Sequence, residues 1–430
     1  MIWIYRLIFV PAFILAIPYL LWHMKRRGGY RENFGQKFGK LPPLSEKSAK
    51  KRIWIQAVSV GEVRALRPLL DTWLREENCE IVLTSSSSTG YRIARQEYSH
   101  LCLGIYYFPF DFILFVRRTF KTIAPDLCIL MEAELWPEYI WTAKKRGIPL
   151  ALINARMSDK TFKIHKRLKW LYPHVFKDLN LVAASNERNA MRFQNLGADP
   201  QKTMSVGNLK CDVPSPTSLT QEEKACLLRD LGFGYLESTS APALILCGAS
   251  TWPGEEQVLL NIYQKLRAEG VNLRLLITPR HMERRQEIRR ELEKYPFTWH
   301  LRSEGPASGP VEVCVADTTG ELSLLQQLAD VVFVGRSMPP NRGGQTPIEA
   351  AQLGKPIVFG PDMSNFRDIA SGLVETGVAT RIENEAELAN AIRALCLDKQ
   401  AREQVIEKAA IWQASSRGAT QRTLKALQSI

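Results

Sequence analysis

The sequence lacks the residue spacings that mark common metal and disulfide sites. Its eight cysteines are scattered singly, from Cys79 to Cys396, and none forms a Cys-x-x-Cys pair. The six histidines are dispersed too, without a His-x-x-x-His pair. These absences argue against a dedicated zinc site and against a small disulfide framework, and isolated cysteines are typical of a reducing compartment. We therefore expect no bound metal and no cofactor.

Three nucleotide-related signatures are also missing. The chain contains neither the Walker Gly-x-x-x-x-Gly-Lys-[Ser/Thr] pattern nor Gly-x-Gly-x-x-Gly, which makes a dinucleotide-dependent oxidoreductase a remote alternative. No Asp-x-Asp occurs either. A donor with a diphosphate leaving group often needs a metal, whereas a monophosphate can be bound by basic residues and helix N-termini alone.

The charge that is present is mostly positive and lies in the first half of the chain. The 430 residues carry a formal net charge of +13, with basic clusters at 25–31, 50–52, 117–121 and 163–169. Such clusters favour an anionic partner, for instance a phospholipid surface or a phosphorylated lipid. They lack the interleaved aromatic residues of an RNA-binding module, so we expect no nucleic-acid partner.

The first 24 residues are predicted to form a membrane-anchor helix. Residues 2–22 are apolar except for Arg6, Pro11 and Pro18, and a helix of this length reaches about 30 Å, close to one hydrocarbon thickness. Lys25, Arg26 and Arg27 follow, which places the rest of the chain on the cytoplasmic side of the membrane. A spanning helix and an interfacial helix both fit the sequence, and a buried core helix is the remaining alternative.

From residue 52 onward, short apolar runs alternate with amphipathic stretches, which is typical of a doubly wound α/β fold. In the first half, strands are predicted at 53–58, 80–84, 127–131, 150–154 and 179–184, with helices at 63–76, 90–98 and 136–146. In the second half, strands are predicted at 243–247, 273–278, 311–315, 331–334 and 356–359. We expect two Rossmann-like domains, 25–213 and 241–430, joined by a linker over 214–240 and facing a central cleft.

Polar residues directly follow several predicted strands of the first half, where ligands of such folds bind. Glu62 lies in the first turn of a predicted helix after the first strand, where a carboxylate favours the ionised form and can accept a proton from a hydroxyl. Acids are common at helix starts, so position alone does not make Glu62 catalytic. Glu132 and Glu134 follow the strand at 127–131, where acids are tolerated only when exposed or paired.

The second half places phosphate-binding chemistry at the same kind of position. Ser250 and Thr251 lie in a loop between a strand and a helix, and the backbone N–H groups of such a loop can hold a phosphate. Arg280 puts a guanidinium at the end of the next strand. A long Gly-rich loop follows the strand at 331–334. Together these loops indicate a nucleotide-type ligand.

These loops, taken together, resemble those of the 3-deoxy-D-manno-octulosonic acid (Kdo) transferases that build the inner core of lipopolysaccharide. The matching motifs occur in the same order as in the family and cover nearly the whole chain. Its motifs lie in the N-terminal anchor and at 31–39, 59–62, 132–137, 154–158, 207–212, 278–281, 317–322, 343–350 and 359–366.

The resemblance implies a GT-B fold and inverting, metal-independent transfer of Kdo from CMP-Kdo to a lipid A precursor. It assigns the general base to Glu62. It implies acceptor binding by Glu132, Glu134, Asn154 and Arg156. It implies donor binding by Ser250, Thr251, Pro279, Arg280, Gly343, Gly344, Glu349 and Asn365, with Glu349 at the ribose hydroxyls.

The chain departs from the family's usual residues at seven positions, five of them in the donor half. The family usually has His at Trp252, Gly at Arg336, His-Asn at Gln345-Thr346, His at Asp362, Thr at Ala133 and Asn at Glu138. These departures concern donor choice more than the fold. Alternatives are therefore a related transferase with another CMP-activated acidic sugar or lipid acceptor, and a catalytically silent membrane-bound homologue that binds the lipid A precursor. The retained Glu62 and Arg280 argue against the silent homologue.

Overall fold

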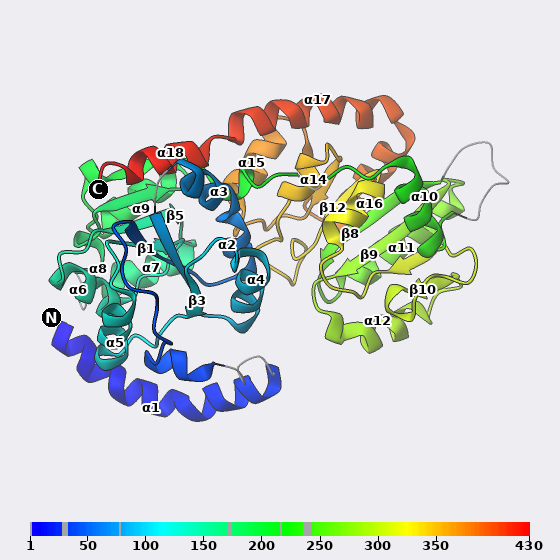
Figure 1. Cartoon of the computed structure of the whole chain (residues 1–430). Coiled ribbons are helices and arrows are strands. Elements are labelled where there is room, and N and C mark those ends of the chain that lie inside the picture. Colours follow the sequence, from blue (N-terminus) through cyan, green and yellow to red (C-terminus); the bar gives the residue numbers. More distant parts are fainter. Residues whose placement is uncertain (1, 28–32, 77–78, 171–173, 216, 235–242) are drawn as a thin grey trace. The chain divides into compact units, whose positions relative to one another are not determined.

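The computed structural model describes residues 2–27, 33–76, 79–170, 174–215, 217–234 and 243–430. The chain forms two compact units, one made of Met1–Pro214 with Ser416–Ile430 and the other of Ser215–Ser415. Each unit is a sheet flanked by helices (Figure 1). Part of the first predicted basic cluster (28–31) and part of the predicted linker (216 and 235–240) lie outside the described residues.

The first unit is built on a seven-stranded parallel sheet. Its strands, in spatial order, are β3 (Gly104–Tyr107), β2 (Cys79–Ser85), β1 (Lys51–Ala57), β4 (Leu127–Met131), β5 (Leu150–Ala155), β6 (Leu181–Ala184) and β7 (Thr203–Ser205). The chain runs outward from β1 on one side and from β4 on the other. The loops that follow these two strands therefore diverge at a topological switch point, where open α/β sheets bind ligands.

Helices cover both faces of this sheet, which is why its central strands are continuous apolar runs. The helical elements between the strands are η1 (Phe34–Phe38), α2 (Val60–Ala65), α3 (Arg67–Glu76), α4 (Ser88–Tyr98), α5 (Ile113–Ile123), α6 (Pro137–Lys145), α7 (Asp159–Leu168), α8 (His174–Lys177), α9 (Glu187–Leu196), η2 (Pro200–Lys202) and η3 (Leu209–Cys211). Trp54 of β1 is fully buried and packs against the rings of Phe120 and Tyr139 from α5 and α6.

The last helix of the chain, α18 (Ala419–Leu427), completes the first unit. Its Leu424 and Leu427 belong to the core cluster that also holds residues of β1 and β2. The Asp212 carboxylate accepts hydrogen bonds from the backbone N–H groups of Gly418 and Thr420, at 2.8 and 2.5 Å. The sequence pattern placed this segment in the second domain, whereas residues 416–430 pack with the first.

The N-terminal helix α1 (Ile2–Arg27) is bound to the first unit along one side. The Arg6 guanidinium makes two hydrogen bonds to the Glu138 carboxylate, of 2.8 and 2.9 Å, and the Tyr5 hydroxyl donates to Asp111 at 2.8 Å. On other positions of the helix, Trp3, Leu7 and Leu15 are 72%, 75% and 80% exposed. None of the helices formed by the described residues has the length and hydropathy of a membrane span.

The second unit repeats the architecture with another seven-stranded parallel sheet. Its strands, in spatial order, are β10 (Trp299–Leu301), β11 (Val313–Val315), β9 (Leu273–Pro279), β8 (Leu244–Thr251), β12 (Val331–Val334), β13 (Ile357–Phe359) and β14 (Ala379–Arg381). The switch point lies between β8 and β12, so the loops after these strands face the corresponding binding edge.

The helical elements of the second unit are α10 (Gln221–Asp230), α11 (Glu255–Ala268), η4 (Met282–Arg284), α12 (Arg285–Leu292), η5 (Arg302–Glu304), α13 (Leu322–Leu325), η6 (Gln326–Leu328), α14 (Ile348–Gln352), α15 (Arg367–Glu375), α16 (Glu385–Leu397) and α17 (Lys399–Ser416). Helix α10 lies inside the segment that the sequence predicted to be a linker. Its capping box, formed by Thr220 and Glu223, fixes where it begins.

The prediction of two parallel α/β sheets is confirmed, and each predicted strand overlaps a strand of the structure. The missed strands are β3, β7, β10 and β14, which are the outermost strands of the two sheets. They contain only three or four residues each. An edge strand has a neighbouring strand on one side only. Strands this short contain too few apolar residues to produce a hydrophobic pattern in the sequence.

Candidate active site

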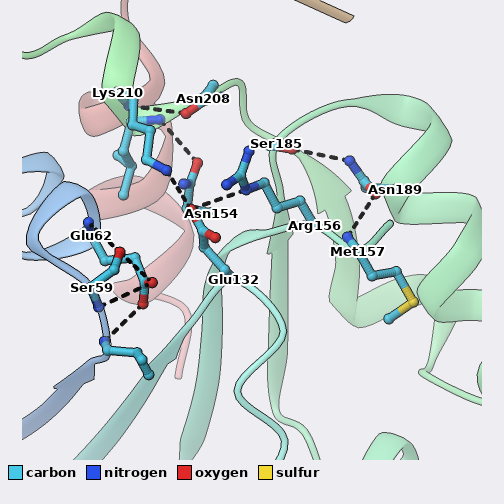
Figure 2. A network of polar contacts seen from close by, with 12 residues as sticks. Ser59, Glu62, Glu132, Asn154, Arg156, Met157, Ser185, Asn189, Asn208 and Lys210 are labelled. Atoms are coloured by element: carbon cyan, nitrogen blue, oxygen red, sulfur yellow. Dashed lines mark hydrogen bonds and ion pairs between the residues drawn. The ribbon is translucent and has the colours of Figure 1, made fainter. Parts of the chain in front are cut away.

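The candidate site of the first unit begins with Glu62, which a capping box holds at the start of α2. The Ser59 hydroxyl accepts a hydrogen bond from the Glu62 backbone N–H at 3.3 Å and donates one to the Glu62 carboxylate at 2.8 Å. The carboxylate also accepts from the backbone N–H groups of Val58 and Ser59, at 2.9 and 3.3 Å. Figure 2 shows this arrangement directly after β1. The side chain therefore has a fixed position at the switch point.

The surroundings of Glu62 make it a stronger base than an ordinary glutamate. The residue is only 6% exposed. Burial is the main cause that raises the pKa of Glu62, and the charge of Glu132 adds to it. The hydrogen bonds from Val58 and Ser59 and the charge of Lys210 act in the opposite direction but do not cancel the rise. A carboxylate with a raised pKa is suited to accept a proton from a hydroxyl.

Glu132, which follows β4, lies between two cations (Figure 2). Its carboxylate is 2.7 Å from the Lys210 ammonium and 3.0 Å from the Arg156 guanidinium. Burial by itself would raise the pKa of Glu132, but the charges and hydrogen bonds of Lys210 and Arg156 outweigh it and hold the pKa below its usual value. Glu132 is therefore the more readily ionised acid and fixes the two cations, whereas Glu62 is the more easily protonated one.

Asn154 connects the end of β5 to the segment that carries Lys210. Its backbone is in the left-handed region, at φ 48°, and its side-chain oxygen accepts a hydrogen bond from the Leu209 backbone N–H at 3.1 Å. Asn208 in turn accepts from the Lys210 backbone N–H at 3.0 Å. The Asn154 side-chain nitrogen is buried and has no hydrogen-bond partner among the described residues. Because Asn154 is fully buried, its side chain acts within the fold and positions the segment that carries Lys210.

Glu134 is a second acid with an altered proton affinity in this region. The Trp136 indole N–H donates to its carboxylate at 3.0 Å. Burial, followed by the charge of Glu62, raises the pKa of Glu134 to about 7. The first unit thus brings together the predicted residues Glu62, Glu132, Asn154 and Arg156, with Glu134 close enough to interact with Glu62 through its charge. Lys210, which the site prediction did not single out, lies between them. Its only signal was its place in the family motif at 207–212.

In the second unit, a pocket lies at the carboxyl ends of β8, β9 and β11. Ser250, Pro279 and Arg280, all predicted donor-binding residues, line it together with Thr318, Thr319 and Glu321. The Glu321 carboxylate is held by Arg302 at 2.9 Å. The Thr251 side chain is fully buried and donates to Glu256 at 2.8 Å, so it is not available to a ligand. The prediction that Ser250 and Thr251 lie in a loop is wrong, because they are the last two residues of β8, where Ser250 has a φ of 54°.

The other predicted donor-binding residues lie on the loops after β12 and β13. Gly343 and Gly344 have φ of 106° and 70°, and a Cβ atom on Gly343 would lie 2.4 Å from the Asn365 side-chain nitrogen. Asn365 also donates its backbone N–H to the Gly343 carbonyl at 2.8 Å. Glu349, in the first turn of α14, accepts a hydrogen bond from Ser323 at 2.8 Å. The glycines are required because the two loops approach so closely.

Comparisons with known proteins point in one direction. The family description "3-Deoxy-D-manno-octulosonic-acid transferase (kdotransferase)" matches residues 32–213, and "Glycosyl transferases group 1" matches residues 310–412. The 3-deoxy-D-manno-octulosonic acid transferase of Bordetella pertussis is 30% identical over 95% of this chain and 94% of its own length. That of Chlamydia pneumoniae is 28% identical over 99% of this chain and 95% of its own length.

Among solved structures, UDP-GlcNAc 2-epimerase from Neisseria meningitidis matches with a TM-score of 0.60 and 12% identity, over 88% of this chain and 100% of that one. At this identity the likeness concerns the fold alone.

Proposed function

The chain belongs to the 3-deoxy-D-manno-octulosonic acid transferase family, and on that premise we propose that it transfers Kdo from CMP-Kdo to a lipid A precursor. It is a glycosyltransferase of lipopolysaccharide biosynthesis. The observation that carries the proposed chemistry is Glu62, a buried carboxylate with a raised pKa at the switch point of the first sheet. Its capping box fixes the carboxylate before any substrate arrives.

In the proposed reaction, Glu62 in its ionised form accepts the proton of an acceptor hydroxyl. The hydroxyl oxygen forms a bond to the anomeric carbon of Kdo from the face opposite the leaving group. The bond between that carbon and the phosphate oxygen breaks, and CMP departs with the electron pair. The configuration is therefore inverted. General-base assistance of this kind contributes roughly 10²–10⁴ to the rate.

The network around Glu132 is suited to hold the acceptor. Lys210 and Arg156 are fixed by one carboxylate, so their remaining N–H donors are oriented before binding. The lipid A precursor is phosphorylated and anionic, which agrees with two cations at this edge of the sheet. We assign acceptor binding to Arg156 and Lys210, with Glu132 and Asn154 as the residues that position them.

The loops of the second unit are suited to a nucleoside monophosphate. Arg280 offers a guanidinium to a phosphate, and Ser250, Thr318 and Thr319 line the same pocket. The glycine pair at 343–344 lets the backbone approach closely, and Glu349 offers a carboxylate for ribose hydroxyls. We propose that this edge binds CMP-Kdo without a metal and that the chain has a fold of the GT-B type.

We also propose that α1 attaches the chain to the cytoplasmic face of the inner membrane by lying in the interface. Arg6 is bound to the buried Glu138, and this contact with the first unit favours an interfacial helix over a spanning one. The exposed Trp3, Leu7 and Leu15 offer an apolar surface to the acyl boundary. Flotation with vesicles of inner-membrane phospholipids tests this proposal. Wild-type protein should float with the vesicles and the triple serine variant at these positions should not, whereas equal flotation of both would contradict it.

Mass spectrometry of a complete reaction tests the function. Purified protein in detergent is mixed with tetra-acylated lipid A precursor and with CMP-Kdo that is generated in place. A mass gain of one or more Kdo units establishes donor, acceptor and number of transfers together. With folded protein and intact CMP-Kdo, no gain would contradict Kdo transfer. A gain with another CMP-activated acidic sugar would indicate the related transferase, and CMP binding without any turnover the silent homologue.

A further inference from the structure

Two departures from the family pattern contact each other in the second unit. The Arg336 guanidinium carbon lies 4.5 Å from the centroid of the Trp252 ring, in a cation–π contact. The Trp252 ring meets the His281 ring edge to face, with 5.1 Å between centroids. Where the family usually has His and Gly, this chain thus has an indole with a guanidinium held over it. The two substitutions form one structural unit.

This stack lies beside the candidate donor pocket. Gly335, which precedes Arg336, packs so closely against the end of β8 that a Cβ atom on it would lie 2.5 Å from the Ser250 carbonyl oxygen. Ser250 lines the pocket, and so does Arg280, the neighbour of His281. The Arg280 backbone N–H donates to the Thr251 carbonyl at 3.1 Å, which ties these loops together. Arg336 therefore directly follows a residue that packs against Ser250 of the pocket lining.

The nearest buried acid holds the backbone of this stack and leaves the guanidinium unneutralised. The Glu255 carboxylate accepts hydrogen bonds from the backbone N–H groups of Trp252, Arg336, Ser337 and Met338, between 2.8 and 3.1 Å. Within the described residues, no carboxylate forms an ion pair with the Arg336 guanidinium. Its planar set of N–H donors is thus oriented by the Trp252 ring while keeping its full charge.

Two features of this stack cost free energy locally, a left-handed backbone and an unpaired buried donor. Arg336 has φ of 59°, a left-handed conformation that glycine adopts freely and a side chain with a Cβ atom does not. The Trp252 indole N–H is enclosed and has no hydrogen-bond partner among the described residues. Strained backbone and an unpaired buried donor concentrate at ligand sites, where the surrounding structure holds them in place for function.

We propose that Arg336, held in position by Trp252, binds the carboxylate of the acidic sugar in the donor and so selects the sugar. The inference rests on the proposed function and deepens it. A guanidinium matches a carboxylate with two parallel hydrogen bonds. In the proposed function, the nucleotide phosphate is bound at the pocket lined by Ser250 and Arg280. The sugar carboxylate is the donor's second anionic group, and Arg336 offers it a guanidinium.

The test compares the Arg336→Gly variant with wild type in two measurements. The first is the KM for CMP-Kdo in the transfer reaction, and the second is the inhibition constant of CMP, which keeps the phosphate but has no sugar carboxylate. We expect the KM to rise about tenfold or more, because two charge-assisted hydrogen bonds are lost. The CMP inhibition constant should change less than about twofold. Glycine suits the backbone at this position, so the variant should melt no lower than wild type.

Three further variants sharpen the result. Trp252→His should raise the KM as well, and the double variant should be little worse than Arg336→Gly, because Trp252 acts through Arg336. Arg336→Lys, which keeps the charge and loses the planar fork, should fall between wild type and Arg336→Gly. The matched control Arg342→Ala removes a neighbouring exposed arginine of the same loop and should leave both constants unchanged.

Two outcomes would overturn the inference. An unchanged KM in Arg336→Gly would remove Arg336 from donor binding. An equal rise of KM and CMP inhibition constant would place the guanidinium at the phosphate instead of the sugar. Tryptophan fluorescence titration with fresh CMP-Kdo and with CMP, without lipid acceptor, separates this test from the proposed function. If the variant binds CMP-Kdo more weakly than wild type does but binds CMP equally well, the inference is supported. This holds even if wild-type protein transferred no sugar.

Discussion

At the scale of single residues, the carboxylates after β1 and β4 differ in their protonation because their neighbours differ. Glu132 contacts two cations and has a lowered pKa, whereas burial and the charge of Glu132 raise the pKa of Glu62. The sequence places these acids at one edge of a sheet. It does not reveal the ion pair between Glu132 and Lys210, because the partners are far apart in the chain and are brought together by tertiary contacts such as that between Asn154 and Leu209.

This difference predicts a pH effect for Glu132→Gln. Removing the charge of Glu132 removes one cause of the raised pKa of Glu62 and leaves Lys210 free to lower it further. Glu62 must be ionised to accept a proton, so the acidic limb of the pH dependence of kcat/KM should move to lower pH. The plateau should fall by about tenfold or more, because the cations lose their fixed position.

The measurement is a pH series of transfer rates for wild type and variant. Glu97→Gln, which removes a surface carboxylate paired with Arg64 on the same unit, serves as the control and should leave the limb in place. An acidic limb that stays in place or moves to higher pH in Glu132→Gln would show that Glu132 does not tune Glu62.

At the scale of elements, most of the architecture follows from apolar runs and from local capping, and both can be predicted from sequence. The Ser59–Glu62 capping box is local and lies in a single motif. The contact of α1 with α6 is not local. Arg6 interrupts the apolar run, and Glu138 stands where the family usually has Asn, so each residue alone looks misplaced. In the structure they form one buried ion pair, with 12% and 1% of their side chains exposed.

This pairing predicts a double-mutant result. Arg6→Leu leaves a buried, uncompensated carboxylate and should lower the free energy of unfolding by roughly 3 kcal/mol. Adding Glu138→Asn should restore much of that loss, because the uncompensated charge of Glu138 is then removed as well. Chemical denaturation of the full chain in detergent measures both. The surface pair Arg64–Glu97 is the control, and Arg64→Leu should lower the free energy by less than about 1 kcal/mol. Additive losses from Arg6→Leu and Glu138→Asn would contradict coupling through the ion pair.

At the scale of the whole molecule, the chain builds its first unit from two separate segments. The sequence predicts two α/β domains, and the structure contains them. The return of residues 416–430 to the first unit could not be predicted from helical periodicity, which marks α18 as a helix but not the sheet that it covers. Its place depends on the contacts of Asp212 with the backbone at Gly418 and Thr420. The division of labour between an acceptor unit and a donor unit is the proposal that this architecture supports.

The measurement that tests the role of Glu62 most directly is the rate of Kdo transfer by Glu62→Gln. The variant is compared with wild type, and CMP binding is measured for both. Glutamine keeps the size of the side chain and removes its ability to accept a proton. We predict that transfer falls by roughly 10²–10⁴, while the CMP inhibition or binding constant and the melting temperature stay close to wild type. Transfer within about twofold of wild type would contradict the assignment of Glu62 as the base.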